Sequence, residues 1–179
     1  MKALAKLILR IIGWKAKGTP PDATKFIAVA APHTSNIDFI LGRLYFFSIG
    51  KKPNVLIKKE LFFFPLGNLL KALGGISVDR KRSGNVVDQM AELFQQRKNL
   101  ILVITPEGTR SRVKNWKKGF YHIARKADVP VLLGGFDYGN KIFKISSLYK
   151  VGDDPDKEMQ TIKAFFKDCK PRHPEKFDY

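Results

Sequence analysis

The stretch "KFIAVAAPHTSNIDF", residues 25–39, joins an apolar run to a short polar turn and then to a second apolar run. The first run, 26–31, is short enough to be a buried strand. Ser35 or Asn36 then offers a side chain that can cap a helix beginning directly after the turn. A strand that passes through a turn into a helix is a building unit of α/β folds. The stretch therefore predicts an α/β fold.

Within this stretch, His33 and Asp38 are five residues apart. Five steps on a helix separate two side chains by roughly 140°, and an odd step on a strand places them on opposite faces. The two can meet if His33 ends the strand and Asp38 lies in the first turn of the helix. Asp38 would then hold one ring nitrogen of His33 and leave the other to accept a proton from a hydroxyl. On spacing alone, a purely structural pair is the commoner outcome.

The remaining sequence continues the alternation of short apolar runs with amphipathic ones. We expect further strands at 54–59, 76–80, 100–105, 129–138 and 141–151, and helices at 36–50, 83–99, 120–127 and 155–169. A helix at 61–75 would be interrupted by Pro65 and Gly67. The run "LILVIT", 100–105, has no polar residue before Thr105 and is expected at the centre of the sheet. These patterns predict a single α/β domain whose central, mostly parallel mixed sheet has helices on both faces.

The N-terminal segment predicts an amphipathic helix that precedes this domain. In "MKALAKLILRIIGWK", residues 1–15, apolar residues recur at helical spacing, with Trp14 last, while Lys2, Lys6 and Arg10 lie elsewhere around the helix. This pattern is typical of a helix in a membrane interface with Trp14 at the boundary. A helix packed on the domain and a secretory signal are the alternatives. We expect the helical segment to cover 1–17, the domain 18–170, and a loose C-terminal tail 171–179.

Composition narrows the classes of function. The chain has 33 Lys and Arg against 16 Asp and Glu, a formal charge of +17, which predicts attraction to nucleic acid, anionic lipid or an acidic protein. Nucleic-acid binding is a remote alternative, because no zinc finger, Walker loop or RNA-binding sheet signature occurs in the sequence. The single cysteine, Cys169, cannot form an internal disulfide. No apolar stretch reaches the roughly 18 to 20 residues of a membrane-spanning helix.

Three cations follow separate predicted strands: Lys58, Arg80 and Arg110. His33 follows a fourth, and a parallel sheet could gather all four at one edge, although spacing does not establish this. The stretch "TPEGTRS", 105–111, contains a glycine that allows close backbone approach. It also contains Arg110, whose guanidinium suits phosphate.

Four blocks in order resemble the glycerolipid acyltransferase family, typified by bacterial 1-acylglycerol-3-phosphate acyltransferase. They are "PHTSNID" at 32–38, "IKKELFFFPLGNLLKALGGISVDR" at 57–80, "TPEGTRS" at 105–111 and "VPVLLGGF" at 129–136. Three departures from the family pattern are Pro32 in place of Asn, Thr105 in place of Phe, and the lack of a second proline in the fourth block. These departures spare the histidine, the aspartate and the arginine.

The resemblance implies that His33 is the general base and that Asp38 orients it. It links the acceptor to Glu107, Gly108, Thr109 and Arg110, and it links Lys58 and Arg80 to the acceptor's phosphate. It implies neither a metal nor a cofactor, because a thioester is already activated. The apolar run at 61–75 could then be core, an acyl channel or a bilayer contact. The basic loop 110–120, around Trp116, could bind head groups or an acidic carrier protein, or remain solvated.

The function implied is transfer of a fatty acyl chain from acyl-CoA or acyl carrier protein to a hydroxyl of a lysolipid. The first acceptor expected is 1-acylglycerol-3-phosphate, in phospholipid biosynthesis. The alternative is an acceptor without phosphate, such as an aminolipid. We expect an anionic membrane surface as a partner and no nucleic acid. The expected location is the cytoplasmic face of the cell membrane, as a peripheral, monotopic protein.

Overall fold

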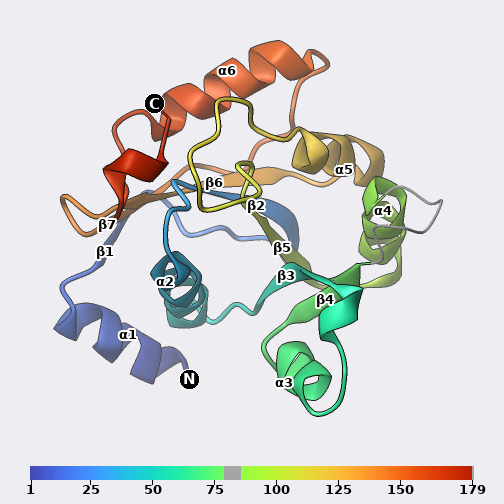
Figure 1. The fold of residues 1–179 in the computed structure, drawn as a ribbon, viewed down its shortest axis with the longest axis horizontal. Coiled ribbons are helices and arrows are strands. Elements are labelled where there is room, and N and C mark those ends of the chain that lie inside the picture. Colours follow the sequence, from blue (N-terminus) through green and yellow to red (C-terminus); the bar gives the residue numbers. More distant parts are fainter. Residues whose placement is uncertain (79–85, 179) are drawn as a thin grey trace.

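The computed structural model describes residues 1–78 and 86–178, in which seven strands form one sheet with helices on both faces (Figure 1). The order across the sheet is β1-β7-β6-β2-β5-β3-β4. The strands are β1 Lys15–Lys17, β2 Lys25–Ala31, β3 Pro53–Lys58, β4 Gly75–Val78, β5 Leu100–Ile104, β6 Val131–Asp137 and β7 Ile142–Ile145. Within the described strands, all neighbours pair in parallel except β6 and β7. The mostly parallel mixed sheet predicted from the sequence is therefore confirmed.

Helices cover the two faces of this sheet because β2 alternates its side chains between two apolar layers. Ile27 and Val29 pack into the layer that contains α4 Val86–Gln96, α5 Gly119–Ala127 and α6 Pro155–Phe166. Phe26 and Ala28 pack into the opposite layer, with α2 Asn36–Ser48 and α1 Lys2–Ile11. The shorter helices are η1 Lys59–Leu61, α3 Leu66–Ala72 and η2 Pro174–Lys176. Both faces of the central strand are thus buried, which explains why its sequence is continuously apolar.

The parallel pairing brings several strand ends to one edge of the sheet. The strand β2 pairs in parallel with β5 and β6, and β3 pairs in parallel with β4 and β5. The carboxyl ends of these five strands therefore share one edge. The strand β5 is interior, as expected, but β2 takes the middle position of the seven.

The N-terminal segment differs from the single helix expected over 1–17. The helix α1 ends at Ile11, and Gly13 adopts a φ of +79°, a left-handed conformation that reverses the chain. Trp14 is 8% exposed and packs on Phe143, so the prediction that it lies at a membrane boundary is wrong. Residues 15–17 instead form the edge strand β1, paired with β7.

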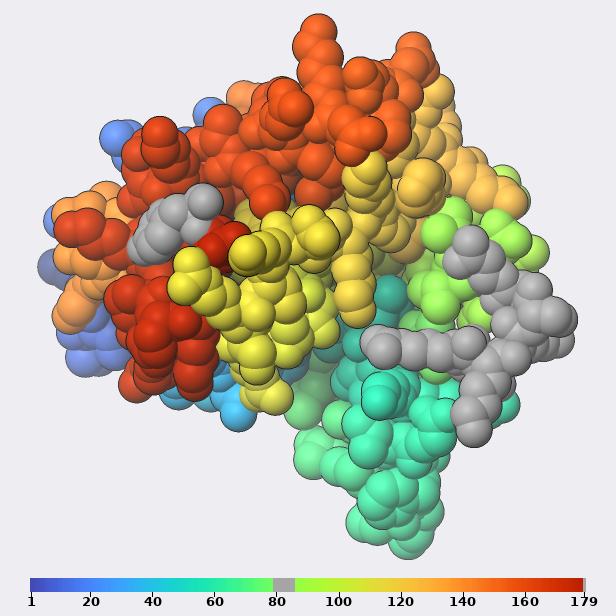
Figure 2. Space-filling view, turned by 45° about the horizontal axis from the view of Figure 1, so that its top comes forward, coloured from blue at the N-terminus to red at the C-terminus, as the bar shows by residue number. Residues whose placement is uncertain are grey.

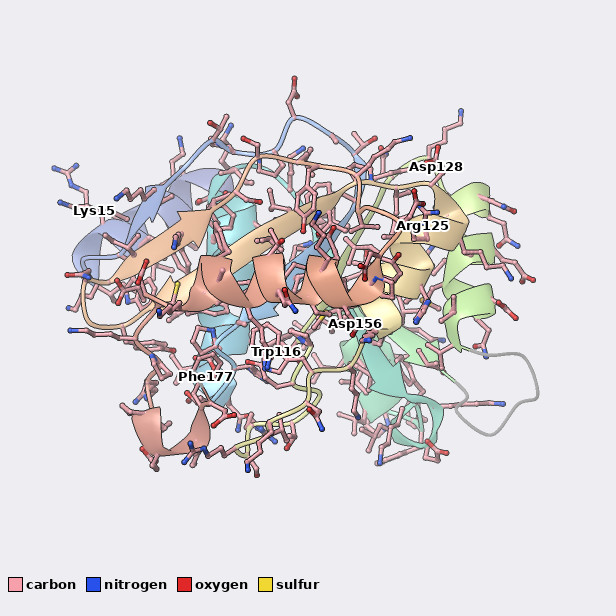
Figure 3. The ribbon with its side chains drawn as sticks, turned by 90° about the horizontal axis from the view of Figure 1, so that it is seen from above. Lys15, Trp116, Arg125, Asp128, Asp156 and Phe177 are labelled. Carbon is pink, nitrogen blue, oxygen red and sulfur yellow. The ribbon has the colours of Figure 1, made fainter. Side chains whose placement is uncertain are left out.

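The C-terminal segment is also different from the loose tail that we expected. The side chain of Phe177 is buried, with its ring centroid 6.2 Å from that of Trp116, and Figure 3 labels both residues beside α6. Asp178 forms an ion pair with Arg112 at 2.7 Å. The backbone N–H of His173 donates to the Thr34 hydroxyl at 3.2 Å. The tail is therefore docked against the turn that follows β2 and against the loop that follows β5.

Candidate active site

The turn after β2 is held by the side chain of Asp38, the third residue of α2. Its Oδ2 accepts the backbone N–H groups of Thr34 and Ser35, each at 2.8 Å. Ser35 is the N-cap residue of α2, and its hydroxyl accepts the N–H of Ile37 at 3.2 Å. These reciprocal bonds form a capping box, which begins the helix where the sequence predicted it. Asp38 is 1% exposed, so its carboxylate is fixed inside the protein.

The same turn brings His33 and Asp38 together. The Nδ1 atom of His33 lies 3.2 Å from Asp38 Oδ2, and the imidazole is the more exposed partner. Burial by itself would raise the pKa of Asp38, but the hydrogen bonds from His33, Tyr138 and the Ser35 N–H outweigh it and lower that pKa. An ionised Asp38 holds the proton of His33 on Nδ1. The other ring nitrogen, Nε2, is then left as the proton acceptor.

Glu107, in the loop after β5, reaches the backbone of the histidine. Its Oε1 accepts the N–H of His33 at 2.8 Å, and the side chain is 5% exposed. Within the described part of the chain, Oε2 is buried and has no hydrogen-bond partner. Burial raises the pKa of Glu107 from its ordinary value of 4.5 to about 7. In this geometry, Glu107 holds the main chain of the histidine.

Tyr138 is the residue of this cluster that the sequence reasoning missed. It directly follows β6, and its hydroxyl donates to Oδ1 of Asp38, 100 residues away in the sequence. The feature that points to Tyr138 is its position directly after β6, which pairs in parallel with β2. Without the strand order, that position could not be related to the histidine.

His33 and Asp38 lie beside a cavity of about 730 Å³. Three cations of the described residues line it: Arg43, whose guanidinium donates to the Leu73 carbonyl, Arg110, which was predicted, and Lys117, which lies in the basic loop. Gly108 has a φ of +65°, and a Cβ added there would lie 3.0 Å from the Lys117 ammonium. The cavity walls otherwise consist mainly of apolar side chains from α2 and the sheet, among them Ala30, Phe39, Phe46, Leu56, Ile57 and Phe136. The site therefore combines a base, cations and an apolar wall.

Comparisons with known proteins identify the family of this chain. The model of a family described as "Acyltransferase" matches residues 19–132, more than half of the chain. The chain belongs to the acyltransferase family. Within that family, it is 34% identical over 106 residues to a 1-acyl-sn-glycerol-3-phosphate acyltransferase of Cocos nucifera, covering 56% of this chain and 33% of that one. It is 32% identical over 135 residues to the protein of the same name from Limnanthes douglasii, covering 70% of this chain and 46% of that one.

The acyltransferase chain thus spans less than half the length of these two relatives. A crystal structure of the 1-acyl-sn-glycerophosphate (LPA) acyltransferase PlsC from Thermotoga maritima shares its fold, with a TM-score of 0.58 and 20% identity. The similarity covers 91% of this chain and 75% of the Thermotoga chain. This likeness supports the arrangement of the sheet and its helices.

The other residues that the family resemblance implied occupy different environments in the acyltransferase. Lys58 is exposed at the end of β3, while its neighbour Ile57 lines the cavity. The Thr109 hydroxyl accepts the N–H of Ser111 at 3.3 Å and shapes the loop. Arg80 and the expected start of the helix at 83 lie outside the described residues. The acceptor-binding roles of these residues stay predictions.

The sequence left open the roles of the apolar run 61–75 and of the basic loop around Trp116, and the structure narrows both. In the run 61–75, Phe63 and Phe64 are exposed, so the core interpretation is wrong for them, whereas Leu61 lines the cavity. In the basic loop, Arg112 pairs with Asp178, and Lys118 pairs with Asp156 at 2.6 Å. The loop is therefore partly tied to the domain.

Proposed function

We propose that this acyltransferase moves a fatty acyl group from acyl-CoA or acyl carrier protein to a hydroxyl of a lysolipid, with 1-acylglycerol-3-phosphate as the acceptor. The observation that carries the proposal is the His33 and Asp38 pair beside an apolar cavity that also contains Arg110 and Lys117. The relatives named for this acceptor support its identity.

In the proposed reaction, Nε2 of His33 takes the proton of the acceptor hydroxyl while the hydroxyl oxygen attacks the thioester carbonyl carbon. Asp38 holds the Nδ1–H and stabilises the imidazolium that forms. The tetrahedral intermediate then breaks its carbon–sulfur bond. The departing thiolate takes the proton from His33, which leaves the free thiol, the acylated lipid and a neutral imidazole.

Arg110 and Lys117 are the cations that we assign to the acceptor phosphate. Both line the same cavity as His33, on the loop that leaves the carboxyl end of β5. A guanidinium forms paired hydrogen bonds to phosphate oxygens, and an ammonium adds a second positive charge. The absence of a Cβ at Gly108 lets the Lys117 side chain pass close to the loop, because an added Cβ would lie only 3.0 Å from its ammonium. This supports an acceptor that carries a phosphate near its reacting hydroxyl.

We further propose that the protein works at an anionic membrane surface, on the cytoplasmic face of the cell membrane. The helix α1 packs on the domain through Ala5 and Leu9, yet it leaves a second apolar face exposed, with Leu7 at 53%. Phe64 is 85% exposed on the segment between β3 and β4, which projects from the body of the protein (Figure 2). The exposed apolar residues of these two segments are Leu4, Leu7, Ile11, Leu61, Phe63, Phe64, Leu69 and Leu73.

Basic residues accompany these apolar ones, which supports lipid rather than a neutral partner. Lys2, Lys6 and Arg10 are exposed on α1, Lys58 is exposed directly before the projecting segment, and Lys71 is exposed within it, on α3. Exposed apolar patches rimmed by cations are typical of interfacial membrane contacts. Over residues 1–78 and 86–178, no helix combines the length and apolarity needed to cross a bilayer. The proposed attachment is therefore peripheral.

The test is acyl transfer by the purified chain with acyl-CoA and acyl carrier protein donors in parallel. The acceptors are lysophosphatidate, other lysolipids and lipids without phosphate, and the His33→Ala variant is the control. We expect transfer to lysophosphatidate that disappears in His33→Ala. Transfer confined to acceptors without phosphate would overturn the roles of Arg110 and Lys117, and activity retained in His33→Ala would overturn the mechanism.

A further inference from the structure

The two oxygens of the Asp38 carboxylate have different surroundings. Oδ2 faces His33 Nδ1 and accepts the N–H groups of Thr34 and Ser35. Oδ1 accepts the hydroxyl of Tyr138. Because Asp38 is almost completely buried, water cannot replace a donor that is lost on the Oδ1 side. The rotation of the carboxylate, and hence the direction of Oδ2, depends on what binds Oδ1.

We infer that Tyr138 is a positioning residue for the transfer reaction: its hydroxyl fixes the Asp38 carboxylate so that Oδ2 stays aligned with His33 Nδ1. The catalytic part of this inference rests on the proposed function. Asp38 lines the cavity and Tyr138 does not. Tyr138 therefore acts through Asp38 and contacts neither substrate.

Tyr138 can do this because its own position is held from three sides. Its N–H donates to the Lys170 carbonyl at 2.8 Å, in the segment that follows α6. The ring of Trp14 meets its ring edge-on, with centroids 5.0 Å apart. The Arg172 guanidinium lies 6.0 Å from the ring centroid. Trp14 and the segment that follows α6 thus support Tyr138, which in turn supports Asp38.

The hydroxyl of Tyr138 is also kept as a donor. Burial, followed by the hydrogen bond to Asp38, raises its pKa above the ordinary tyrosine value, so the hydroxyl keeps its proton at physiological pH. Tyr138→Phe removes this donor and little volume. The expected result is a carboxylate that rotates between orientations and a His33 whose proton is less firmly held on Nδ1.

The kinetic test compares Tyr138→Phe with wild type. We expect kcat to fall about tenfold with both KM values unchanged, as when a hydrogen bond that orients a catalytic group is removed. Tyr121→Phe is the matched control, because that hydroxyl donates to the carbonyls of Gly152 and Asp153, each at 2.9 Å, and none of these three residues lines the cavity. The control should keep the wild-type kcat. A wild-type kcat in Tyr138→Phe, or a loss that appears in KM alone, would overturn the inference.

A second readout separates this inference from the proposed function. The protein has three histidines, so ¹⁵N NMR of histidine-labelled protein can follow the tautomer of His33 with His122 as the internal reference. We expect the Nδ1–H tautomer of His33 in wild type and a mixture in Tyr138→Phe, with His122 unchanged. An identical tautomer in both proteins refutes the positioning role. If wild type transfers no acyl group, the proposed function fails while this measurement still decides the role of Tyr138.

Discussion

Glu107→Gln should change how the stability of this protein depends on pH. The Glu107 carboxyl is buried beside His33, and burial raises its pKa from 4.5 to about 7. An acid with a raised pKa in the folded state binds its proton more tightly there than in the unfolded chain. Its stabilising contribution is therefore complete below pH 4.5 and is lost as the pH rises toward 7. Glutamine keeps a carbonyl oxygen for the His33 N–H but does not titrate.

The size of the effect follows from the two pKa values. A change from 4.5 to about 7 corresponds to roughly 3 kcal/mol in the free energy of unfolding. Between pH 4 and pH 8, the stability of Glu107→Gln relative to wild type should rise by about this amount. For a chain of 179 residues, this corresponds to a relative shift in Tm of roughly 6 to 12 °C.

Urea unfolding of both proteins at pH 4 and pH 8 measures the difference directly. Glu92→Gln, on the exposed face of α4, is the matched control and should unfold in parallel with wild type at both pH values. Parallel pH profiles for wild type and Glu107→Gln would refute the reasoning about the buried carboxyl.

Three further predictions concern the reaction and the membrane. Asp38→Asn should lower kcat by roughly 10³-fold or more in steady-state kinetics, because the amide cannot stabilise the imidazolium; a loss below about tenfold would contradict the pairing with His33. Arg110→Ala should raise the KM of a phosphorylated acceptor by roughly 10- to 100-fold, and an unchanged KM would remove its phosphate role. Replacing Leu4 and Leu7 with Gln should reduce co-sedimentation with anionic vesicles, and wild-type binding should weaken as salt rises. Equal vesicle binding by both proteins would exclude α1 as the anchor.

Local sequence determined the turn that joins β2 to α2. Ser35 caps the helix and Asp38 closes the capping box, so the bonds of this box all lie within a few residues. The apolar runs likewise predicted the interior strands, because a strand covered on both faces must be apolar throughout. The pairing of His33 with Asp38 could be predicted for the same reason.

Sequence patterns failed where distant segments compete for burial. Trp14 has the spacing of an interfacial residue, but Gly13 turns the chain and lets its ring pack against Phe143. The C-terminal residues 171–179 show no amphipathic period, yet the burial of Phe177 beside Trp116 docks the tail. Neither outcome could be obtained from periodicity, because each depends on a partner in another part of the chain.

The sequence by itself thus determined the interior strands, the local turn and the paired His33 and Asp38. The tertiary structure alone decided which groups surround that pair. Glu107 and Tyr138 reach it across 74 and 100 residues, and Lys117 joins Arg110 in the same cavity. These contacts follow from the order of β6, β2 and β5 in the sheet, which brings the carboxyl ends of three strands to one edge. Strand order is set by packing of the whole chain, and no short stretch of residues encodes it.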